Sequence, residues 1–429
     1  MSATADMVTD RLSLKPLALP AIAGEGPLFD LKRAAAARFR ELGAPARRLE
    51  RWKYTSLTPL AGAAFTLGGK AGAAELPRIA GTVRLVFVNG RFDAARTDAL
   101  PDGVVPLGSL GAADMLPLLG PVMDAPDQAL ATLNTAFSSD GYVVELAAGA
   151  VLEQPLHIVH VTAAGAVANP RNIVRLGADA RATIVESWLG DGEYWANPVT
   201  DIRLATGAAL THYKWQREAG PAFHTALTSV SIAAAARYEA LTLATGGRIM
   251  RQEFSIGLDG EGADCRLAGA ALGHEAQHLD FTVTMDHRSP HAHSGQAFKS
   301  VLASGARSVF QGLVKVGRGA VGTDAHQTSN NLLLDRSAEA DAKPELEIFA
   351  DDVACSHGAT VGELDEAKVF YLKSRGLSDE AARALLVEGF VAELFDDLAD
   401  AAIALHLREG AQAAARRLTE KGRREKEAV

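Results

Sequence analysis

The chain has 429 residues, of which 48% are hydrophobic and 22% are charged, and its formal net charge is −9 at pH 7. This composition excludes global disorder and predicts a large core, organised in two or three domains or in one extended architecture. Because the net charge is negative, there is no overall basic surface, and a nucleic-acid-binding function is not expected.

Two cysteines, Cys265 and Cys355, are too few for a disulfide framework and are compatible with a reducing compartment. The apolar run PLALPAIAG at 16–24 contains two prolines and follows acidic residues, so we do not expect a signal peptide. No apolar run approaches the roughly 20 residues that are needed to cross a bilayer. We therefore expect a soluble protein of the cytoplasm.

The first predicted element is an amphipathic helix over residues 28–42, where apolar side chains recur at helical spacing. Pro27 is suited to the start of this helix and Gly43 to its end. The segment RWKYTSL at 51–57 follows, and its two aromatic residues are expected to be partly buried anchors on the next layer. These elements predict an N-terminal helical region over residues 1–80.

From residue 82 to 334, short runs rich in Val, Ile, Thr and aromatic residues alternate with turn-forming residues. Glycines followed by alanine punctuate this region, and the gaps from Gly149 to Gly177 and on to Gly207 are 28 and 30 residues. A quasi-period of about 25–30 residues predicts a β-solenoid in which each coil stacks on the next. A β-sandwich is the alternative, but the strand-rich region is long for one sandwich. We assign the β-helix core to residues 81–343.

Helix-forming sequence is expected after Pro344, and we assign residues 344–429 to a C-terminal helical domain. The segment LDEAKVFYLKSRG ends at Gly376, before an apolar residue, which predicts a left-handed C-terminal cap. Ser378 is a suitable N-cap for a second helix. Apolar residues of that helix recur at the spacing of one core-facing stripe: Leu385, Leu386, Phe390, Leu394, Phe395 and Leu398.

The stretch GHEAQHLD at 273–280 contains His-Glu-x-x-His, the zinc-binding pattern of many metalloproteases. On a helix, His274 and His278 could share a zinc ion, but on a strand they stand about 13 Å apart. From His278 onward, apolar and polar residues alternate with a period of two, which predicts a strand that starts there. A zinc-dependent hydrolase that uses His274, Glu275 and His278 is therefore the alternative hypothesis and not the preferred one.

Two further patterns lie close to this stretch. His287, His291 and His293 are interpreted as polar rungs and loops of the solenoid, in preference to a stable metal site. The pattern GRGAVG at 317–322, with Asp335 beyond it, has the spelling of a dinucleotide-binding fingerprint. The sequence after it forms no amphipathic helix, so turn glycines at a corner of a coil are preferred.

Cys355 and His357 lie in KPELEIFADDVACSHGATVGELDEAKVFYLKSRG at 343–376, which joins strand-like sequence to helix-like sequence. In an extended chain both side chains point to one face, where a thiolate and an imidazole could bind a soft metal or a cluster. Two ligands are too few for an iron–sulfur cluster, so the others must come from elsewhere. A buried cysteine and a satisfied histidine at a domain junction are the alternative. A cysteine protease is disfavoured, because residues so close in sequence rarely form a nucleophile and its base.

This stretch resembles the SufB/SufD family, the paired scaffold subunits of the Suf iron–sulfur cluster assembly machinery. Further matching segments are QAFKSVLASGARSVFQGLVKV at 296–316 and NNLLLDRSAEADAKPELEIF at 330–349, with RWKYTSL at 51–57 as an N-terminal match. The form CSHGAT at 355–360 resembles the SufD branch, and the N-terminal cysteine clusters of the SufB branch are absent. The resemblance covers most of the chain.

The resemblance implies a right-handed parallel β-helix flanked by helical ends, and a non-enzymatic scaffold function. It implies a complex with SufB and the ATPase SufC, in which SufC engages the C-terminal helices around Leu385, Leu386 and Phe390. A nascent cluster is expected at the SufB–SufD contact, where Cys355 and His357 are the candidate transient metal ligands of this chain and the partner chain supplies the rest. Whether His357 ligates iron or donates a proton is left open. No cofactor that stays bound to the isolated chain is implied, and a homodimer of the isolated chain is left open.

A polysaccharide-binding or polysaccharide-cleaving β-helix is the remaining hypothesis. Its groove would usually display rows of aromatic and carboxylate side chains, whereas aromatic residues make up only 6% of this chain. The preferred function is therefore scaffolding of cluster assembly, and the zinc-dependent hydrolase is the alternative from another class.

Overall fold

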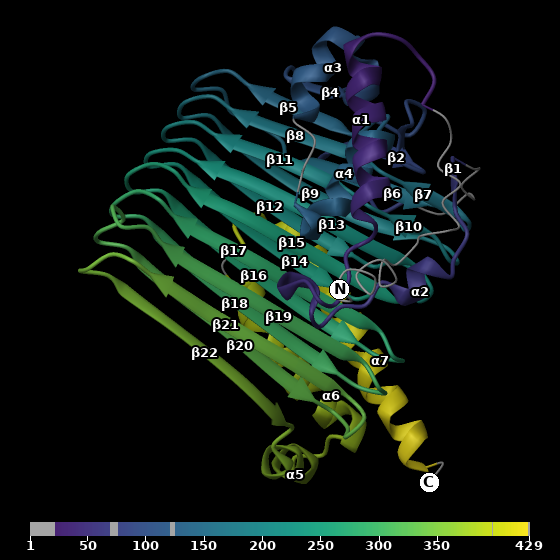
Figure 1. The fold of residues 1–429 in the computed structure, drawn as a ribbon. Coiled ribbons are helices and arrows are strands. Elements are labelled where there is room, and N and C mark those ends of the chain that lie inside the picture. The colour runs from purple at the N-terminus through teal and green to yellow at the C-terminus, as the bar shows by residue number, and fades with distance from the viewer. Residues whose placement is uncertain (1–21, 69–75, 121–124, 397, 428–429) are drawn as a thin grey trace, which may run out of the picture.

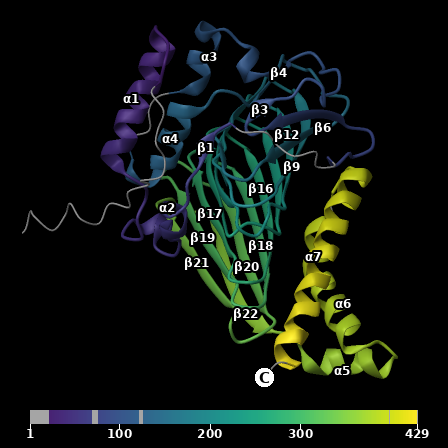
Figure 2. The same cartoon turned by 90° about the vertical axis from the view of Figure 1, so that its right-hand side faces the viewer.

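The computed structural model describes residues 22–68, 76–120, 125–396 and 398–427. Most of the apolar run at 16–24 therefore lies outside the described residues. Figures 1 and 2 show two layers of long strands, with helices beside the N-terminal end of one layer and, in yellow, along the other layer. This arrangement confirms the predicted mainly-β fold with helical regions at both ends.

The long strands form two parallel sheets that face each other across a common core. The first sheet stacks, in spatial order, β5 (Tyr142–Leu146), β8 (Arg171–Leu176), β11 (Val199–Leu204), β13 (Phe223–Ile232), β15 (Ile249–Leu258), β17 (His278–His287), β19 (Arg307–Val316) and β21 (Glu339–Ile348). The second sheet stacks β6 (Leu156–Thr162), β9 (Arg181–Gly190), β12 (Ala209–Gln216), β14 (Arg237–Ala244), β16 (Asp264–Gly273), β18 (His293–Leu302), β20 (Asp324–Leu333) and β22 (Ala354–Glu363). Shorter strands pair at the N-terminal end or beside it: β1 (Thr66–Leu67), β2 (Val83–Val88), β3 (Arg91–Phe92), β4 (Val104–Pro106), β7 (Ala166–Ala168) and β10 (Trp195–Ala196).

The register of the strands gives the period of the solenoid. Ile249 pairs with His278, and His278 pairs with Arg307, so these coils of the first sheet are offset by 29 residues. In the second sheet Asp324 pairs with Ala354, an offset of 30 residues. These offsets agree with the quasi-period that the spaced glycines predict. Because each coil pairs with its neighbours in parallel, the fold is a parallel β-solenoid.

Alternation along each strand sends apolar side chains into the lumen between the two sheets. In β17, Leu279 and Phe281 are buried in this core, whereas Asp280 and Thr282 lie on the outer face of the sheet. Burial of one such large apolar side chain stabilises the fold by about 1.5–3 kcal/mol. The two-residue period that starts at His278 is thus the period of a solenoid strand, as predicted.

A polar layer interrupts the core near its N-terminal end. The Glu186 carboxylate on β9 accepts hydrogen bonds from Tyr142 Oη and Trp188 Nε1, each at 2.6 Å. On β12, Lys214 donates to Gln252 Oε1 at 2.8 Å, and burial lowers the pKa of its ammonium group to about 8. These hydrogen bonds offset the cost of burying charged groups. Strand patterning does not reveal the bonds from Tyr142 to Glu186 and from Lys214 to Gln252, because their partners come from different strands.

The N-terminal helices cover part of the outer face of the first sheet (Figure 2). They are α1 (Pro27–Leu42), η1 (Glu50–Trp52), α2 (Thr58–Ala61), η2 (Leu107–Ser109), α3 (Ala112–Leu119), η3 (Pro126–Gln128) and α4 (Ala129–Phe137). The bounds of α1 confirm the predicted start at Pro27 and the end before Gly43. α3 and α4, however, lie inside the region that was predicted to hold strands. Most residues of α4 are buried, so its sequence lacks the polar face by which a helix is recognised.

The C-terminal helices are α5 (Glu366–Ser374), α6 (Asp379–Ala392), η4 (Glu393–Phe395) and α7 (Ala401–Glu427). Their caps confirm the sequence pattern. Gly376, just beyond α5, has a φ of 97°, as a left-handed cap requires. Ser378 Oγ accepts a hydrogen bond from the Ala381 amide at 3.1 Å and so caps the start of α6.

α7 lies along the outer face of the second sheet (Figure 2). Gly410 allows the closest approach, because a Cβ atom there would lie 2.5 Å from the Trp215 indole. Trp215, Leu243 and Leu407 belong to one buried apolar cluster between this helix and the sheet. The second sheet is therefore buried on both of its faces where the helix covers it.

The solenoid extends further along the chain than the sequence suggests. Strands continue past residue 343 through β22, and the first C-terminal helix starts only at Glu366. The prediction that the chain becomes helical after Pro344 is therefore wrong, since Pro344 itself lies within β21. The last coil is exposed, so its strands lack the continuous apolar run by which the earlier coils are recognised.

The buried stripe of α6 also differs from the predicted one. Ala382, Val387 and Val391 are buried where α6 packs against its neighbours, whereas Leu385 is exposed. Of the other predicted positions, Phe395 is buried, and the rest are half-buried: Leu386, Phe390, Leu394 and Leu398. The partner helix and the sheet select this face, and the sequence of α6 alone contains enough apolar residues for more than one stripe.

Candidate functional site

The solenoid ends in an uncovered coil formed by β21 and β22. Each is the terminal strand of its sheet, so within the described residues no further strand pairs with its outer edge. An edge strand presents a row of unpaired backbone N–H and C=O groups, which can pair with another chain. Figure 1 shows this open end at the bottom of the molecule, next to α5.

Cys355 and His357 lie on β22 at this open end. Cys355 pairs in register with Ala325, and His357 pairs with Gln327. Ala325 and Gln327 are buried inward-facing residues, so Cys355 and His357 share the inward face of the next coil. Cys355 is half-buried and His357 is exposed, because no coil among the described residues covers them. The structure therefore brings the two side chains to one face, as expected for an extended chain.

The Cys355 thiol is not activated in the isolated chain. Burial, followed by the negative charge of Asp324, raises its pKa above the usual range. The thiol is therefore protonated at neutral pH and needs a bound metal or a cationic partner to become a thiolate. The positive charge of a metal ion would favour the thiolate in this way.

Apolar side chains surround the open end. Ile348 and Phe349 at the end of β21 and Val361 on β22 are exposed. Large exposed apolar side chains beside unpaired strand edges are typical of a protein–protein interface. We call β21, β22 and these three side chains the open-end surface.

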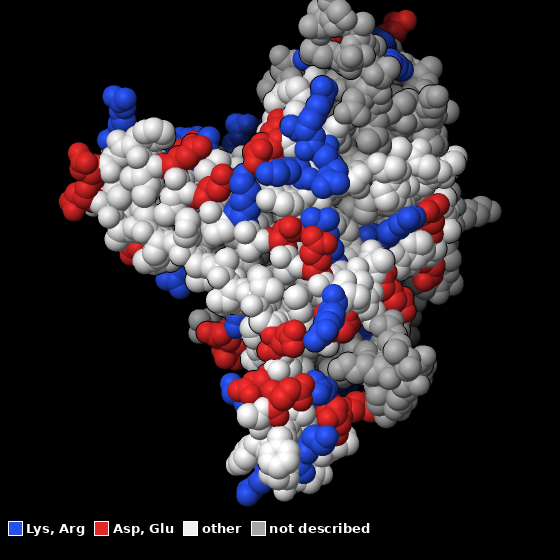
Figure 3. Space-filling view, turned by 60° about the horizontal axis from the view of Figure 1, so that its bottom comes forward, with Lys and Arg blue, Asp and Glu red and all other residues white. Residues whose placement is uncertain are grey.

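The outer face of β21 adds charges to the open-end surface. Its outward side chains are Glu339, Asp341, Lys343, Glu345 and Glu347. Nε of Arg307, one coil earlier, donates to Asp341 at 2.7 Å. Figure 3, in which this end of the molecule comes forward, shows acidic and basic side chains interspersed. Charged edge strands disfavour unspecific pairing, so a partner must match this pattern.

Within the described residues, no group of three or more His, Cys, Asp or Glu side chains could hold a metal ion. Cys355 and His357 could supply two ligands at most, and a cluster that bridges chains would need its others from a partner. Both cysteines of the chain are free, and Cys265 is buried in the core. Cys265 is thus inaccessible to a ligand at the open end.

The His-Glu-x-x-His stretch forms a turn and the start of a strand. β16 ends at Gly273 and β17 starts at His278, while Glu275 and Ala276 have φ values of 54° and 56°. A helix requires negative φ throughout, so the two histidines cannot share one helical face. The predicted strand at His278 is confirmed, and the zinc-hydrolase hypothesis finds no support.

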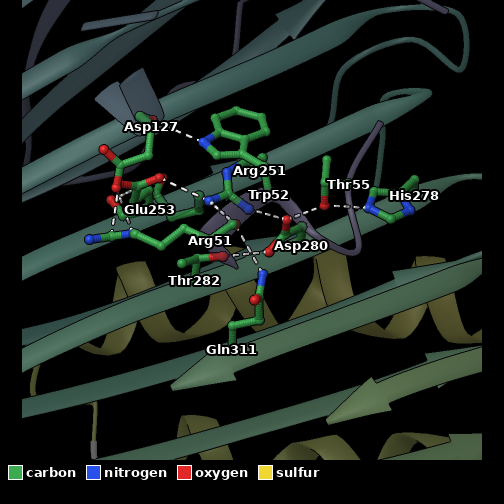
Figure 4. Close-up of polar contacts among 11 residues, drawn as sticks. Arg51, Trp52, Thr55, Asp127, Arg251, Glu253, His278, Asp280, Thr282 and Gln311 are labelled. Carbon is green, nitrogen blue, oxygen red and sulfur yellow. Dashed lines mark hydrogen bonds and ion pairs between the residues drawn. The ribbon is translucent and has the colours of Figure 1, made fainter. Parts of the chain in front are cut away.

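His278 takes part in docking the N-terminal region. Thr55 Oγ1 donates its one proton to Asp280, so it accepts the hydrogen bond from His278 Nε2–H at 2.8 Å. Arg251 forms a buried ion pair with the same Asp280 carboxylate and stacks 4.0 Å from the Trp52 ring centroid. Figure 4 shows how these side chains, from the N-terminal segment and from β15 and β17, converge.

The docking network explains the segment RWKYTSL. Trp52 is buried and donates through Nε1 to the Asp127 carbonyl at 2.9 Å, which confirms its predicted role as an anchor. Arg51 pairs with Glu253 at 2.8 Å. Sequence inspection missed Arg251, although the charged pair Arg251 and Glu253 at alternate positions of a strand is a signal for such a contact.

His274→Ala is expected to leave folding, and the cluster assembly that the resemblance implies, nearly unchanged. His274 lies in a turn at the edge of the solenoid, and the strand after it is held by other residues. Substitutions at such positions usually change the free energy of unfolding by about 0.5 kcal/mol or less. Zinc content, melting temperature and iron–sulfur enzyme activity in cells check this. Simultaneous loss of bound zinc and of function would contradict it.

The other sequence patterns take their predicted places in the solenoid. His287 is buried, with Nε2 at 2.9 Å from Ser294 Oγ, whereas His291 lies in a turn with a φ of 55°. His293 is an exposed first residue of β18. The glycines at 317–322 form the turn between β19 and β20, as preferred over a dinucleotide site.

The C-terminal helices expose apolar side chains of their own. Phe370 and Tyr371 on α5 are 74% and 60% exposed, and Leu385 on α6 is 49% exposed. Arg383 ties the two helices together, because it donates to Asp379 at 2.8 Å and to Glu366 at 2.9 Å. These ion pairs link α5 to α6, which carry the exposed apolar side chains.

No described helix is both long enough and apolar enough to cross a membrane. Two family models match the chain: the SufBD protein N-terminal region over residues 25–158, and the SufBD core domain of SUF system FeS cluster assembly over residues 159–390. The chain belongs to the SufBD family. The core match includes Cys355, His357 and Leu385.

Relatives of the SufBD family match along most of the chain. An iron–sulfur cluster assembly SufBD family protein of Synechocystis sp. is 31% identical over 426 residues, which cover 92% of this chain and 93% of the relative. The iron–sulfur cluster assembly protein SufD of Escherichia coli is 33% identical over 373 residues, which cover 83% of this chain and 86% of the relative. Protein ABCI7, chloroplastic, of Arabidopsis thaliana is 32% identical over 279 residues, which cover 62% of this chain and 58% of the relative. These matches confirm the resemblance that the CSHGAT and RWKYTSL segments indicate.

Proposed function

We propose that this chain is the SufD-type scaffold subunit of a cytoplasmic Suf complex, and that it pairs with a SufB-type subunit through the open-end surface. The observation that carries the proposal is the position of Cys355 and His357 at the C-terminal end of the described solenoid, where the outer edges of the long terminal strands β21 and β22 are unpaired. Their inward-facing side chains would be enclosed once a partner coil covered β21 and β22. The SufD relative and the family match support the SufD assignment.

In this proposal the nascent iron–sulfur cluster is cargo, and the chain has no catalytic activity of its own. The Cys355 thiolate and the His357 imidazole would hold iron for a short time, and the SufB-type partner would supply the remaining ligands.

We place the SufC-type ATPase on α5 and α6. Phe370, Tyr371 and Leu385 are the exposed apolar side chains there, and Leu386 and Phe390 lie half-buried beside them in the sequence of α6. A nucleotide-driven movement of the ATPase would reach the open end through α5, because only two residues separate α5 from β22.

Co-expression with the SufB-type and SufC-type proteins of the same organism tests the proposal. We expect all three chains to elute together from a size-exclusion column, with the mass of a defined complex measured by light scattering. A chain that elutes alone or only as a homodimer, in the presence of both candidates, would contradict the scaffold function. Stoichiometric zinc in that isolated chain would favour the hydrolase.

A further inference from the structure

Polar side chains on the inward face of the second sheet form a column that ends at His357. Gln296 on β18, Gln327 on β20 and His357 on β22 are register partners on three consecutive coils. The two glutamines are 3% and 1% exposed, whereas His357 is exposed because β22 is the last strand of its sheet in the described part of the chain. Adjacent strands lie about 4.8 Å apart, so each side chain of the column is within reach of the next.

The hydrogen bonding of this column is incomplete. Gln327 Nε2 donates to Gln296 Oε1 at 3.3 Å. Gln327 Oε1, however, is buried and has no hydrogen-bond partner among the described residues. A buried polar atom without a partner costs about 1–3 kcal/mol, so this oxygen would gain from a proton donor. The register partner of Gln327 toward the open end is His357, whose neutral ring carries one N–H.

The opposite sheet leaves space for the Gln327 amide. Gly312 lies on β19, across the lumen from β20, and a Cβ atom at Gly312 would lie 1.9 Å from Gln327 Nε2. Any larger residue at this position would push the amide out of the column. The amide therefore occupies a space that a single glycine provides.

We infer that Gln327 is a positioning residue for His357: its Oε1 accepts a hydrogen bond from one ring nitrogen, so that the other ring nitrogen presents its lone pair to iron. Histidines that bind a metal nearly always donate their second N–H in this way, which fixes the tautomer and the orientation of the ring. Gln296 holds the Gln327 amide from the other side. The inference rests on the proposed function, in which His357 is a ligand of the nascent cluster.

Anaerobic titration of the purified complex with Fe(II), in competition with a chromogenic chelator, tests the inference. Loss of such a supporting partner typically weakens metal binding by about 10–100-fold. We expect that weakening in Gln327→Met, which keeps the length of the side chain but removes the acceptor. Gly312→Ala should weaken binding similarly, because it displaces the amide without changing either Gln327 or His357.

Gln327→Glu is the rescue variant, because its carboxylate keeps an acceptor oxygen at the same position. We expect its Fe(II) affinity to return near the wild-type value. His326→Ala is the matched control, since His326 is next to Gln327 but lies on the outer face of β20, where it contacts Ser356. That variant should bind Fe(II) as the wild type does.

The results separate this inference from the proposed function. If His357→Ala loses Fe(II) binding while Gln327→Met and Gly312→Ala retain it, the positioning role is wrong and the ligand role stands. If His357→Ala binds Fe(II) as the wild type does, both are wrong. If Gln327→Met and Gln327→Glu lower the melting temperature and the complex yield by the same amount, the Gln327 amide is needed only for folding. That result overturns the inference.

Discussion

His357→Ala is expected to assemble with its partners in normal yield and to melt at the wild-type temperature, while iron–sulfur enzymes in the same cells lose about tenfold or more of their activity. The side chain is exposed at an uncovered coil, and such substitutions usually change stability by about 0.5 kcal/mol or less. In the proposed site, in contrast, removal of the His357 imidazole leaves the cluster one donor short. Complex yield, thermal melting and enzyme activity in cells measure the two effects separately.

His326→Ala provides the matched control for this experiment. His326 is also an exposed histidine at the open end, one coil earlier, but it faces outward and lies 2.7 Å from Ser356 Oγ. Cluster maturation in this variant should stay normal. Full maturation in the His357→Ala strain would refute the proposed site, and a scarce, unstable complex would assign His357 to folding instead.

The double substitution Phe370→Glu, Leu385→Glu is expected to abolish capture of the SufC-type ATPase. Phe370 is 74% exposed and Leu385 is 49% exposed, so neither substitution removes core packing. In an interface, truncation of a central apolar anchor often costs about 2 kcal/mol or more, which is roughly 30-fold in affinity. A buried unpaired carboxylate adds further cost. A pull-down with purified ATPase measures the loss.

Leu405→Glu is the control for this double variant. Leu405 on α7 is 58% exposed, so the same chemical change is made on a different C-terminal helix. ATPase capture should be unchanged in this control. Capture by the Phe370→Glu, Leu385→Glu variant at the wild-type level would contradict the assignment of α5 and α6.

Point substitutions test this docking more cleanly than truncation. Removal of residues 378–429 would delete α6 and α7 and expose the buried face of the second sheet around Trp215 and Leu243. An exposed apolar face of that kind promotes aggregation, so loss of binding could not be assigned to the missing contact. The C-terminal helices are part of the core of this protein as well as a candidate docking surface.

Local periodicity along the sequence was sufficient for the elements whose residues interact with near neighbours in the chain. The two-residue alternation after His278 predicted β17, and Pro27 with Gly43 predicted the bounds of α1. Spaced glycines predicted the coil length, because every coil must turn at equivalent corners. Helical and extended periods are properties of the backbone, so they can be seen without knowledge of the fold.

Contacts between distant segments were decided by the tertiary structure alone. Thr55 meets Asp280 over a separation of 225 residues, and no local pattern encodes which outer-face residue the N-terminal segment will reach. The boundary near residue 343 was misplaced for a related reason. An exposed last coil has few buried apolar positions, so the apolar run that marks a solenoid strand is missing there.

For the candidate site, the sequence by itself determined that Cys355 and His357 share one face of an extended segment, because side chains alternate along any strand. Only the tertiary structure decided that this face is the inward face of an uncovered coil, with Gln327 as the next side chain in the column. Which coil is last, and which side chains stack in register, depends on how all the coils pair. That pairing is a property of the closed solenoid, and the sequence of one strand does not contain it.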